Sequence, residues 1–207
     1  MNKKIIAGII ALIIIVIAGY TFFYAPYQEK VLSEQFDGNL QNASAIEKEI
    51  TATTEAINKK ETNDVDTLIN TINNDITPKY FEELKILNES DKFANNNETK
   101  IQYLANQTRR IELQSQNYNA TIKILNALSQ MVKGEKSAEE AQNSITRANI
   151  EMEDCNKELN EVYDNITNIL KENPDFNQTL HDLKLEKGFY GEKVVVAQTQ
   201  NIENTTA

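Results

Sequence analysis

Two runs of residues with a seven-residue repeat, separated by a short polar turn, constrain the fold of this chain more than any other feature. Apolar and small residues recur in both runs at alternating spacings of three and four, which is the pattern of a coiled-coil seam. The first run comprises Ile101, Leu104, Thr108, Ile111, Ser115, Tyr118, Ile122, Leu125, Ser129 and Val132, and the second comprises Ala141, Ile145, Ala148, Met152, Cys155, Leu159, Val162, Ile166 and Ile169. The pattern predicts two long helices between residues 98 and 172.

The link between the two runs has the composition of a turn between helices. Gly134 suits the position just after a helix C-terminus, because glycine adopts the left-handed conformation at no steric cost. Ser137 precedes Glu140 by three residues, the spacing of a capping box at a helix N-terminus. The sequence therefore predicts that one helix ends just before Gly134 and that the next begins just after Ser137.

The two helices are predicted to pack as an antiparallel coiled-coil hairpin in a defined register. In such a hairpin the numbers of facing residues add up to a constant. Ile111 with Leu159 and Ile122 with Ala148 both give 270, and half of that value falls in the middle of the turn. The seam and the turn therefore agree, although each is inferred from different residues.

The residues before the hairpin carry the pattern of further helices. Phe36, Ala43, Ile50 and Ile57 recur every seven residues and predict a helix over residues 27–60. A second apolar segment begins near residue 65 and continues to about residue 93, with a kink or a fresh helix start expected at a proline inside it. That proline is Pro78.

A second apolar stripe lies on the first hairpin helix, away from the coiled-coil seam. A two-stranded coil would not need this stripe, whereas a bundle buries it against other helices. The stripe comprises Leu113, Ala120, Ile124, Leu128 and Met131. The sequence thus predicts an all-α fold, an elongated antiparallel bundle of about four long helices over residues 28–186. The helical pattern weakens after Pro174, and residues 187–207 are predicted to form a poorly structured tail.

The N-terminal residues have the pattern of a membrane anchor. Lys3 and Lys4 precede an uncharged, largely apolar run over residues 5–24. Twenty helical residues rise about 30 Å, which matches the hydrocarbon core of a bilayer. We expect a single transmembrane helix within residues 1–27, in contact with lipid through residues 5–24. The positive-inside rule then places the N-terminus in the cytoplasm and the bulk of the chain outside a single-pass cell membrane protein. The alternative is a secretory signal peptide that is cleaved, which would leave a secreted protein.

The charge of the remaining chain limits the kinds of partner that it can bind. Apart from the two N-terminal lysines, 19 basic and 31 acidic residues remain, a net charge of −12. Such a surface repels phosphate backbones, so we expect no nucleic-acid partner. The single cysteine, Cys155, forms no internal disulfide, so stability must come from packing.

Eight asparagines stand in Asn-X-Ser/Thr sequences and are candidate N-glycosylation acceptors in an extracytoplasmic protein. They are Asn42, Asn88, Asn97, Asn106, Asn119, Asn165, Asn177 and Asn204. One interpretation is a glycosylated surface protein. The other is a codon composition that favours asparagine and produces acceptor sequences that are not glycosylated.

The sequence offers no set of residues typical of catalysis, of cofactor binding or of metal binding. His181 is the only histidine and has no catalytic signature around it, and Cys155 falls on the coiled-coil seam, where an inert thiol or a link between two chains is expected. An acidic stripe formed by Glu151, Asp154 and neighbouring carboxylates lacks the loop and glycine of a calcium-binding hand. Its other members are Glu158 and Glu161. We therefore expect no enzyme, no cofactor and no metal site.

These observations predict a membrane-anchored extracytoplasmic helical protein that acts as a non-enzymatic structural or interaction module of the cell envelope. A protein partner or self-association through the helical surface is expected. Two alternatives remain open: a sensor or ligand-binding ectodomain that works with a partner membrane protein, and an accessory subunit of a membrane complex. We find no residue motif specific to a known envelope family.

Overall fold

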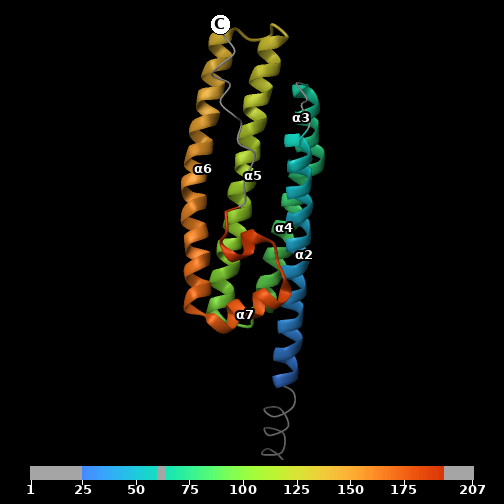
Figure 1. Cartoon of the computed structure of the whole chain (residues 1–207), viewed down its shortest axis with the longest axis vertical. Coiled ribbons are helices and arrows are strands. Elements are labelled where there is room, and N and C mark those ends of the chain that lie inside the picture. The colour runs from blue at the N-terminus through green and yellow to red at the C-terminus, as the bar shows by residue number, and fades with distance from the viewer. Residues whose placement is uncertain (1–24, 60–63, 194–207) are drawn as a thin grey trace, which may run out of the picture.

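The structure is a computed structural model that describes residues 25–59 and 64–193. Every element in these residues is helical, so the predicted all-α class and the helical bundle are confirmed (Figure 1). The elements are α2 (Ala25–Lys59), α3 (Val65–Thr71), the π-helical turn η2 (Ile72–Ile76), α4 (Thr77–Ser90), the 3-10 turn η3 (Asp91–Phe93), α5 (Glu98–Val132), α6 (Ala138–Glu172), α7 (Pro174–Leu183) and the 3-10 turn η4 (Lys187–Tyr190).

Helices α5 and α6 form the predicted antiparallel hairpin, with the predicted outer limits at residues 98 and 172. Gly134 lies in the turn with a φ of 73°, in the left-handed region that favours glycine. The capping box at Ser137 and Glu140 is present, with the Ser137 hydroxyl accepting from the Glu140 amide. Both helix ends are therefore fixed by the local signals read from the sequence.

The polar contacts that join the two helices lie near the predicted register. Asn117 donates to Asn156 at 2.9 Å, and the Cys155 thiol donates to Gln116 at 3.5 Å. The residue numbers of these two pairs add up to 273 and 271, which is close to the predicted 270. On the outer side of the seam, Arg109 binds the carboxylate of Glu158 through two hydrogen bonds of 2.6 and 2.8 Å.

Helix α2 and the α3–α4 segment form the other half of the bundle. Helix α2 packs along α4, and α3 and α4 both pack on α5. Leu113 and Ala120 of the second stripe on α5 are buried, as a bundle requires. Helix α2 continues through Gly38 without a break.

The expected irregularity near Pro78 takes the form of a π-helical turn between α3 and α4. Pro78 lies in the first turn of α4, where its missing N–H costs no hydrogen bond. The preceding residue, Thr77, donates its N–H to the carbonyl of Ile72, five residues back. Ile72 and Ile76 of this turn are both buried in the core.

The C-terminal segment, residues 174–193, differs from the prediction. We expected a poorly structured tail from residue 187, but η4 follows at Lys187, and Phe189 is fully buried. The Tyr190 hydroxyl ties the segment together, because it donates to the Leu180 carbonyl at 3.0 Å and accepts from the Leu185 amide at 3.1 Å. The packed bundle thus extends past the predicted limit at residue 186.

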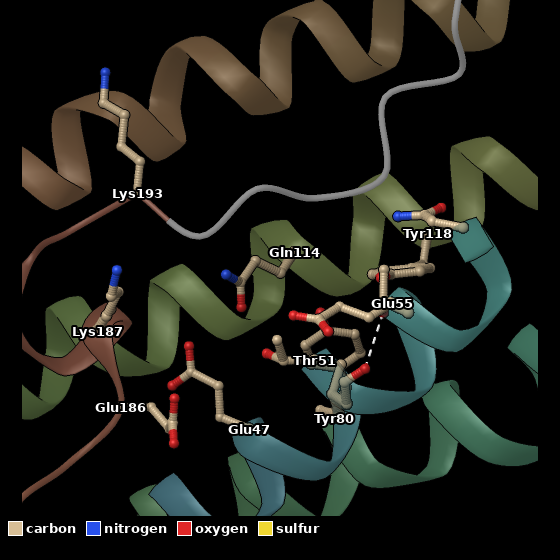
Figure 2. Close-up of a pocket in the computed structure, with 12 residues that line it drawn as sticks. Glu47, Thr51, Glu55, Tyr80, Gln114, Tyr118, Glu186, Lys187 and Lys193 are labelled. Atoms are coloured by element: carbon tan, nitrogen blue, oxygen red, sulfur yellow. Dashed lines mark hydrogen bonds between the residues drawn. The ribbon is translucent and has the colours of Figure 1, made fainter.

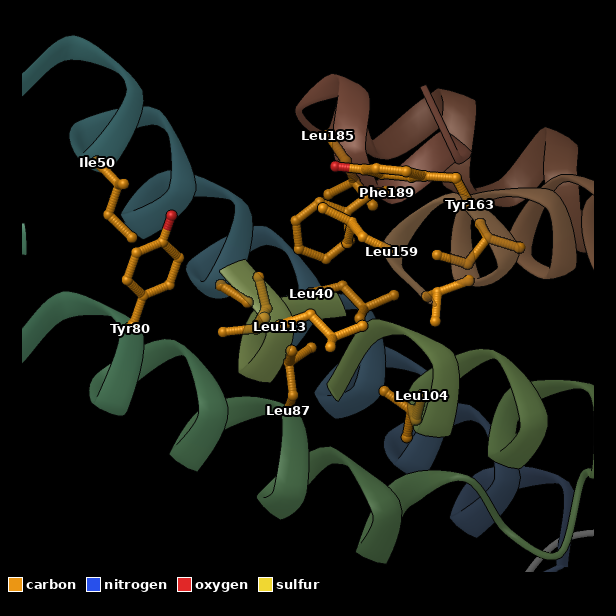
Figure 3. Packing of buried hydrophobic residues seen from close by; sticks show 14 of the residues in the cluster. Leu40, Ile50, Tyr80, Leu87, Leu104, Leu113, Leu159, Tyr163, Leu185 and Phe189 are labelled. Atoms are coloured by element: carbon orange, nitrogen blue, oxygen red, sulfur yellow. The ribbon is translucent and has the colours of Figure 1, made fainter. Parts of the chain in front are cut away.

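This C-terminal segment completes the bundle between α2 and α6. Helix α6 lies against α5, α2 lies against α4, and α7 contacts both α2 and α6 while crossing one end of the bundle (Figure 1). Leu185 and Phe189 then enter the core beside Leu40 of α2 and Leu159 of α6 (Figure 3). The shape of the core therefore depends on a segment in which sequence periodicity is weak.

No helix in the part of the chain that the structure describes is both long and apolar enough to cross a membrane. The expected transmembrane run, residues 5–24, lies outside the described residues.

The hairpin register is testable by placing a charge in the seam. Ile111→Asp buries an unpaired carboxylate at a fully buried position, so we expect the free energy of unfolding to fall by about 4 kcal/mol or more. The matched control is Ile150→Asp, on the face of α6 where the side chain is 55% exposed. Denaturant unfolding measures both variants. Equal losses in the two variants would contradict the register.

Candidate functional site

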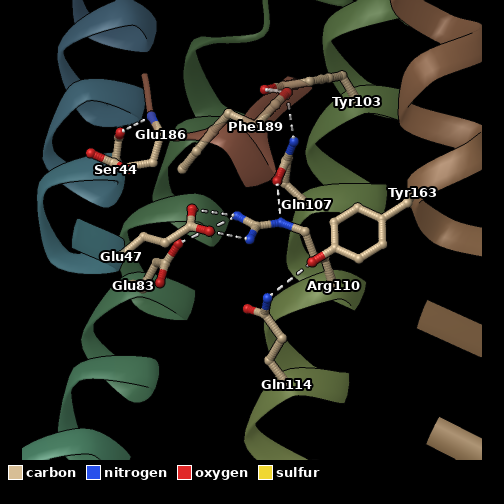
Figure 4. Close-up of polar contacts among 10 residues, drawn as sticks. All are labelled: Ser44, Glu47, Glu83, Tyr103, Gln107, Arg110, Gln114, Tyr163, Glu186 and Phe189. Carbon is tan, nitrogen blue, oxygen red and sulfur yellow. Dashed lines mark hydrogen bonds and ion pairs between the residues drawn. The ribbon is translucent and has the colours of Figure 1, made fainter. Parts of the chain in front are cut away.

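A buried ionic cluster lies at the centre of the bundle. Arg110 of α5 is fully buried and donates from both terminal nitrogens to the carboxylate of Glu47 on α2, at 2.7 and 2.9 Å (Figure 4). A second carboxylate, Glu83 of α4, lies 3.7 Å from the same guanidinium and is also fully buried. Three helices thus contribute one ionisable group each to a buried site.

Each of the three residues occupies a core position on its own helix. Glu83 follows Tyr80 on the inward face of α4, in line with Ile76 of η2, and Leu87 continues that face one turn later. The inward faces of α2 and α5 likewise place their charged residues between buried neighbours, Ala43 and Ile50 on α2 and Gln107 and Gln114 on α5. The helical spacing of the apolar faces therefore forces the three charges together.

The C-terminal segment takes part in the same network. The Phe189 carbonyl accepts from the Tyr103 hydroxyl at 2.8 Å and from the Gln107 amide at 3.2 Å. The Gln107 side chain in turn accepts from Arg110 Nε at 2.8 Å, and the guanidinium lies 5.1 Å from the centre of the Phe189 ring. The segment therefore covers the guanidinium with an aromatic ring and satisfies its neighbours.

The cluster holds one cation and two carboxyl groups, and burial decides their protonation. Burial raises the pKa of Glu83 well above its ordinary value, and repulsion by Glu47 raises it further, while Arg110 opposes the shift. Neither carboxyl oxygen of Glu83 has a hydrogen-bond partner among the described residues. Burial lowers the pKa of Arg110, but Glu47 and Glu83 outweigh this effect and hold the net shift upward. A protonated Glu83 leaves a neutral cluster of one ion pair and one carboxylic acid.

A crevice of about 300 Å³ opens beside the cluster, between α2, α5 and the C-terminal segment (Figure 2). The Tyr118 hydroxyl and the Thr54 hydroxyl share a 2.6 Å hydrogen bond in its wall, and the rings of Tyr80 and Tyr118 lie 5.6 Å apart. The lining residues are Glu47, Ile50, Thr51, Thr54, Glu55, Asn58, Tyr80, Gln114, Tyr118, Glu186, Lys187 and Lys193. This crevice is the candidate ligand site of the described structure.

The residues that the sequence offered as catalytic or metal-binding candidates do not line this crevice. His181 stacks on Tyr190 at 4.6 Å on the surface of α7. Cys155 is half-buried, and burial raises the pKa of its thiol, which disfavours the reactive thiolate. In the acidic stripe, Glu158 forms an ion pair with Arg109, and Glu151 forms an ion pair with Lys123. Within residues 25–59 and 64–193, no three histidine, cysteine or acidic side chains are grouped as a metal would require.

The candidate glycosylation acceptors lie on the helical surface. Exposed acceptors are Asn42, Asn88, Asn97, Asn119 and Asn165, half-buried acceptors are Asn106 and Asn177, and Asn204 lies outside the described residues. Asn97 also caps α5, where its side-chain oxygen accepts from the Lys100 amide at 3.0 Å.

The sequence-based reasoning missed the ionic cluster and the crevice. The signal was present, because the apolar faces of α2, α4 and α5 are each interrupted by one charged residue at a core position, two acidic and one basic. Buried charges are rarely tolerated unless they are paired, so opposite charges at core positions of neighbouring helices predict a contact. The part played by Phe189 has no comparable local signal.

Comparison with protein-family models, with curated protein sequences and with solved structures finds no match to this chain. The site is therefore interpreted from its own geometry.

The protonation of Glu83 is testable through the pH dependence of stability. Because the folded-state pKa lies above the ordinary value of 4.5, the unfolded chain releases the proton first as the pH rises, and stability falls by up to about 1.4 kcal/mol per pH unit. Glu83→Gln imitates the protonated acid and removes this loss. We expect the variant to be more stable than the parent at pH 7, and its stability to change less between pH 5 and pH 7.

The control is Glu82→Gln, which changes the exposed neighbouring carboxylate and should shift the free energy of unfolding by less than about 0.5 kcal/mol. Denaturant unfolding at a series of pH values measures all three proteins. A Glu83→Gln variant with the pH dependence of the parent would contradict a buried neutral acid.

The fit of the C-terminal segment is testable at Gly188. A Cβ at this position would overlap Arg110 Nη1 and Glu47 Oε1, which the buried ion pair holds in place. We expect Gly188→Ala to displace residues 186–190, to cost about 1–3 kcal/mol and to speed amide hydrogen exchange in that segment. Gly38→Ala is the control, since no atom lies within 4 Å and alanine favours the helix interior. Unchanged amide hydrogen exchange in Gly188→Ala would show that the packing of residues 186–190 does not depend on contact with the ionic cluster.

Proposed function

We propose that this protein is a membrane-anchored, extracytoplasmic helical module that holds an interaction surface away from the cell membrane and performs no catalysis. The observation that carries the proposal is the position of α2. The described part of this helix runs without a break from Ala25, the residue that follows the apolar run of residues 5–24, to Lys59. A membrane anchor within residues 5–24 would therefore lead directly into the longest axis of the bundle.

The dimensions of the bundle suit a spacer. Helix α2 has 35 residues, which corresponds to a length of about 52 Å. The turn between α5 and α6 lies at the end of the molecule opposite to the start of α2 (Figure 1). In the proposed orientation, this turn is the part of the described structure farthest from the bilayer.

The far end of the hairpin carries exposed apolar side chains that a partner would cover. Val132, the last residue of α5, is 80% exposed, and the preceding Met131 is 37% exposed. Exposed large apolar residues at this end support a contact with another protein, either a partner or a second copy of this chain. An accessory role in a membrane complex follows from the same surface.

The crevice beside the ionic cluster supports a second candidate, a ligand-binding ectodomain that works with a partner membrane protein. A cavity of about 300 Å³ lies at the lower limit of small-molecule sites. In this alternative the bundle would sense a ligand, and the partner would carry the signal across the membrane.

Cysteine labelling tests the proposed topology. In a Cys155→Ser background, Val132→Cys places one thiol on the exposed end of α5, and Lys3→Cys places one before the apolar run. We expect a membrane-impermeant maleimide to label Val132→Cys in intact cells and Lys3→Cys only after lysis. Deletion of residues 5–24 should release the protein from the membrane fraction.

Protection of Val132→Cys until lysis would overturn the extracytoplasmic location. Recovery of the chain from the medium with a new N-terminus would instead establish the secreted alternative. Exchange of Val132→Cys for Lys157→Cys, on an exposed part of α6, controls for the reactivity of the thiol.

A further inference from the structure

The crevice beside the ionic cluster brings together polar groups that the fold leaves unused. Tyr80 is only 4% exposed and reaches from α4 toward Ile50 of α2, yet its hydroxyl has no hydrogen bond to any other described residue (Figure 3). The hydroxyl itself is not fully buried, because it opens into the crevice. It is therefore available to form a hydrogen bond with a molecule bound there.

Glu47 and Tyr118, two other polar residues of the crevice wall, are engaged within the protein. Glu47 holds Arg110 through both carboxylate oxygens, and the Tyr118 hydroxyl pairs with Thr54. Burial and the nearby Tyr118, Glu83 and Glu47 raise the pKa of Tyr80, so its hydroxyl keeps its proton and is available as a donor.

Free charges of both signs stand at the edge of the crevice. Lys187 and Lys193 form no ion pair with any residue of the described structure, and neither does Glu186. Glu55 is paired only with exposed Lys59 on its own helix, at 3.2 Å. The two lysines lie on one side of the crevice and Glu55 lies on the opposite side (Figure 2).

Apolar surface forms the inner part of the crevice. The rings of Tyr80 and Tyr118 lie 5.6 Å apart at a 47° tilt, and Ile50 lies beside them. Aromatic faces and an aliphatic side chain accommodate a short hydrocarbon body, and the rings also attract an ammonium group.

We propose that this crevice binds a small zwitterion of the α-amino acid class. The carboxylates of Glu55 and Glu186 and the ammonium groups of Lys187 and Lys193 line it, so a ligand with one charge of each sign matches the site better than a net anion or a net cation. The ligand's carboxylate faces Lys187 and Lys193, its ammonium group faces Glu55, and its body lies on the tyrosine rings. A volume of about 300 Å³ limits the ligand to the size of a single amino acid. The inference does not depend on the membrane location of the chain.

Titration of the full-length chain in detergent micelles with alanine, leucine and phenylalanine tests the proposal. Calorimetry and saturation-transfer NMR report binding, and two capped forms of each amino acid serve as probes. The N-acetyl form lacks the ammonium group, and the amide form lacks the carboxylate. We expect at least one free amino acid to bind and each capped form to bind at least tenfold more weakly, because each capped form lacks one of the two charges that the wall residues face.

Variants at the crevice measure how much the Tyr80 hydroxyl and the two lysines each contribute to binding. Tyr80→Phe removes only the free hydroxyl and should weaken binding about threefold to tenfold. Lys187→Gln combined with Lys193→Gln should weaken binding of the amino acid and leave binding of its amide unchanged. Lys157→Gln combined with Lys171→Gln changes two exposed lysines outside the crevice and should leave both affinities unchanged.

Three results would overturn the proposal. The first is no binding of any free amino acid, and the second is equal binding of free and capped forms. The third is binding by a chain that ends at Lys193 but not by the full chain, which would assign the crevice to residues 194–207 of the protein itself.

Discussion

The buried guanidinium of Arg110 is the interaction on which the arrangement of this bundle depends. A charge without solvent is tolerated only when it is paired and hydrogen bonded, and Arg110 meets both conditions through three other elements. Helix α2 supplies Glu47 as a bidentate partner, α4 supplies Glu83, and the C-terminal segment supplies the ring of Phe189. The pair with Glu47 fixes the rotation of α2 relative to α5, because a different rotation would leave the buried guanidinium without its bidentate partner. The cluster therefore specifies one packing of helices whose apolar faces alone would permit others.

The C-terminal segment gives the bundle its second unusual property, an incompletely closed side. The Glu186 amide donates to the Ser44 hydroxyl at 2.7 Å, so the segment is fastened to α2, while η4 packs on α6. The crevice lined by Tyr80 and Tyr118 lies beside this segment, between α2 and α5. A ligand in the crevice would contact both the long helices and the C-terminal segment. In the proposed sensor role, ligand binding would therefore act on the packing between the two.

Much of the fold could be predicted from the sequence, and the reasons differ between its parts. The hairpin limits and register were predictable because the seam, Gly134 and the capping box at Ser137 are local signals that agree. The end of the bundle was predicted too early, because Leu185 and Phe189 are isolated apolar residues whose burial depends on distant helices. The ionic cluster was missed because charged residues at core positions break the apolar pattern on which the helix assignment depends. Sequence reasoning succeeded where neighbours along the chain decide the structure and failed where contacts between distant segments decide it.

The central claim is that the cluster holds Arg110 and Glu47 as ions and Glu83 as a neutral acid. A carbon-13 NMR titration of the glutamate side-chain carboxyls tests this claim directly, with assignments taken from Glu47→Gln and Glu83→Gln. We predict that one carboxyl of the cluster keeps the chemical shift of a protonated acid at neutral pH, and that this signal is lost in Glu83→Gln. A titration in which both carboxyls ionise near the ordinary glutamate value of 4.5 would contradict the account.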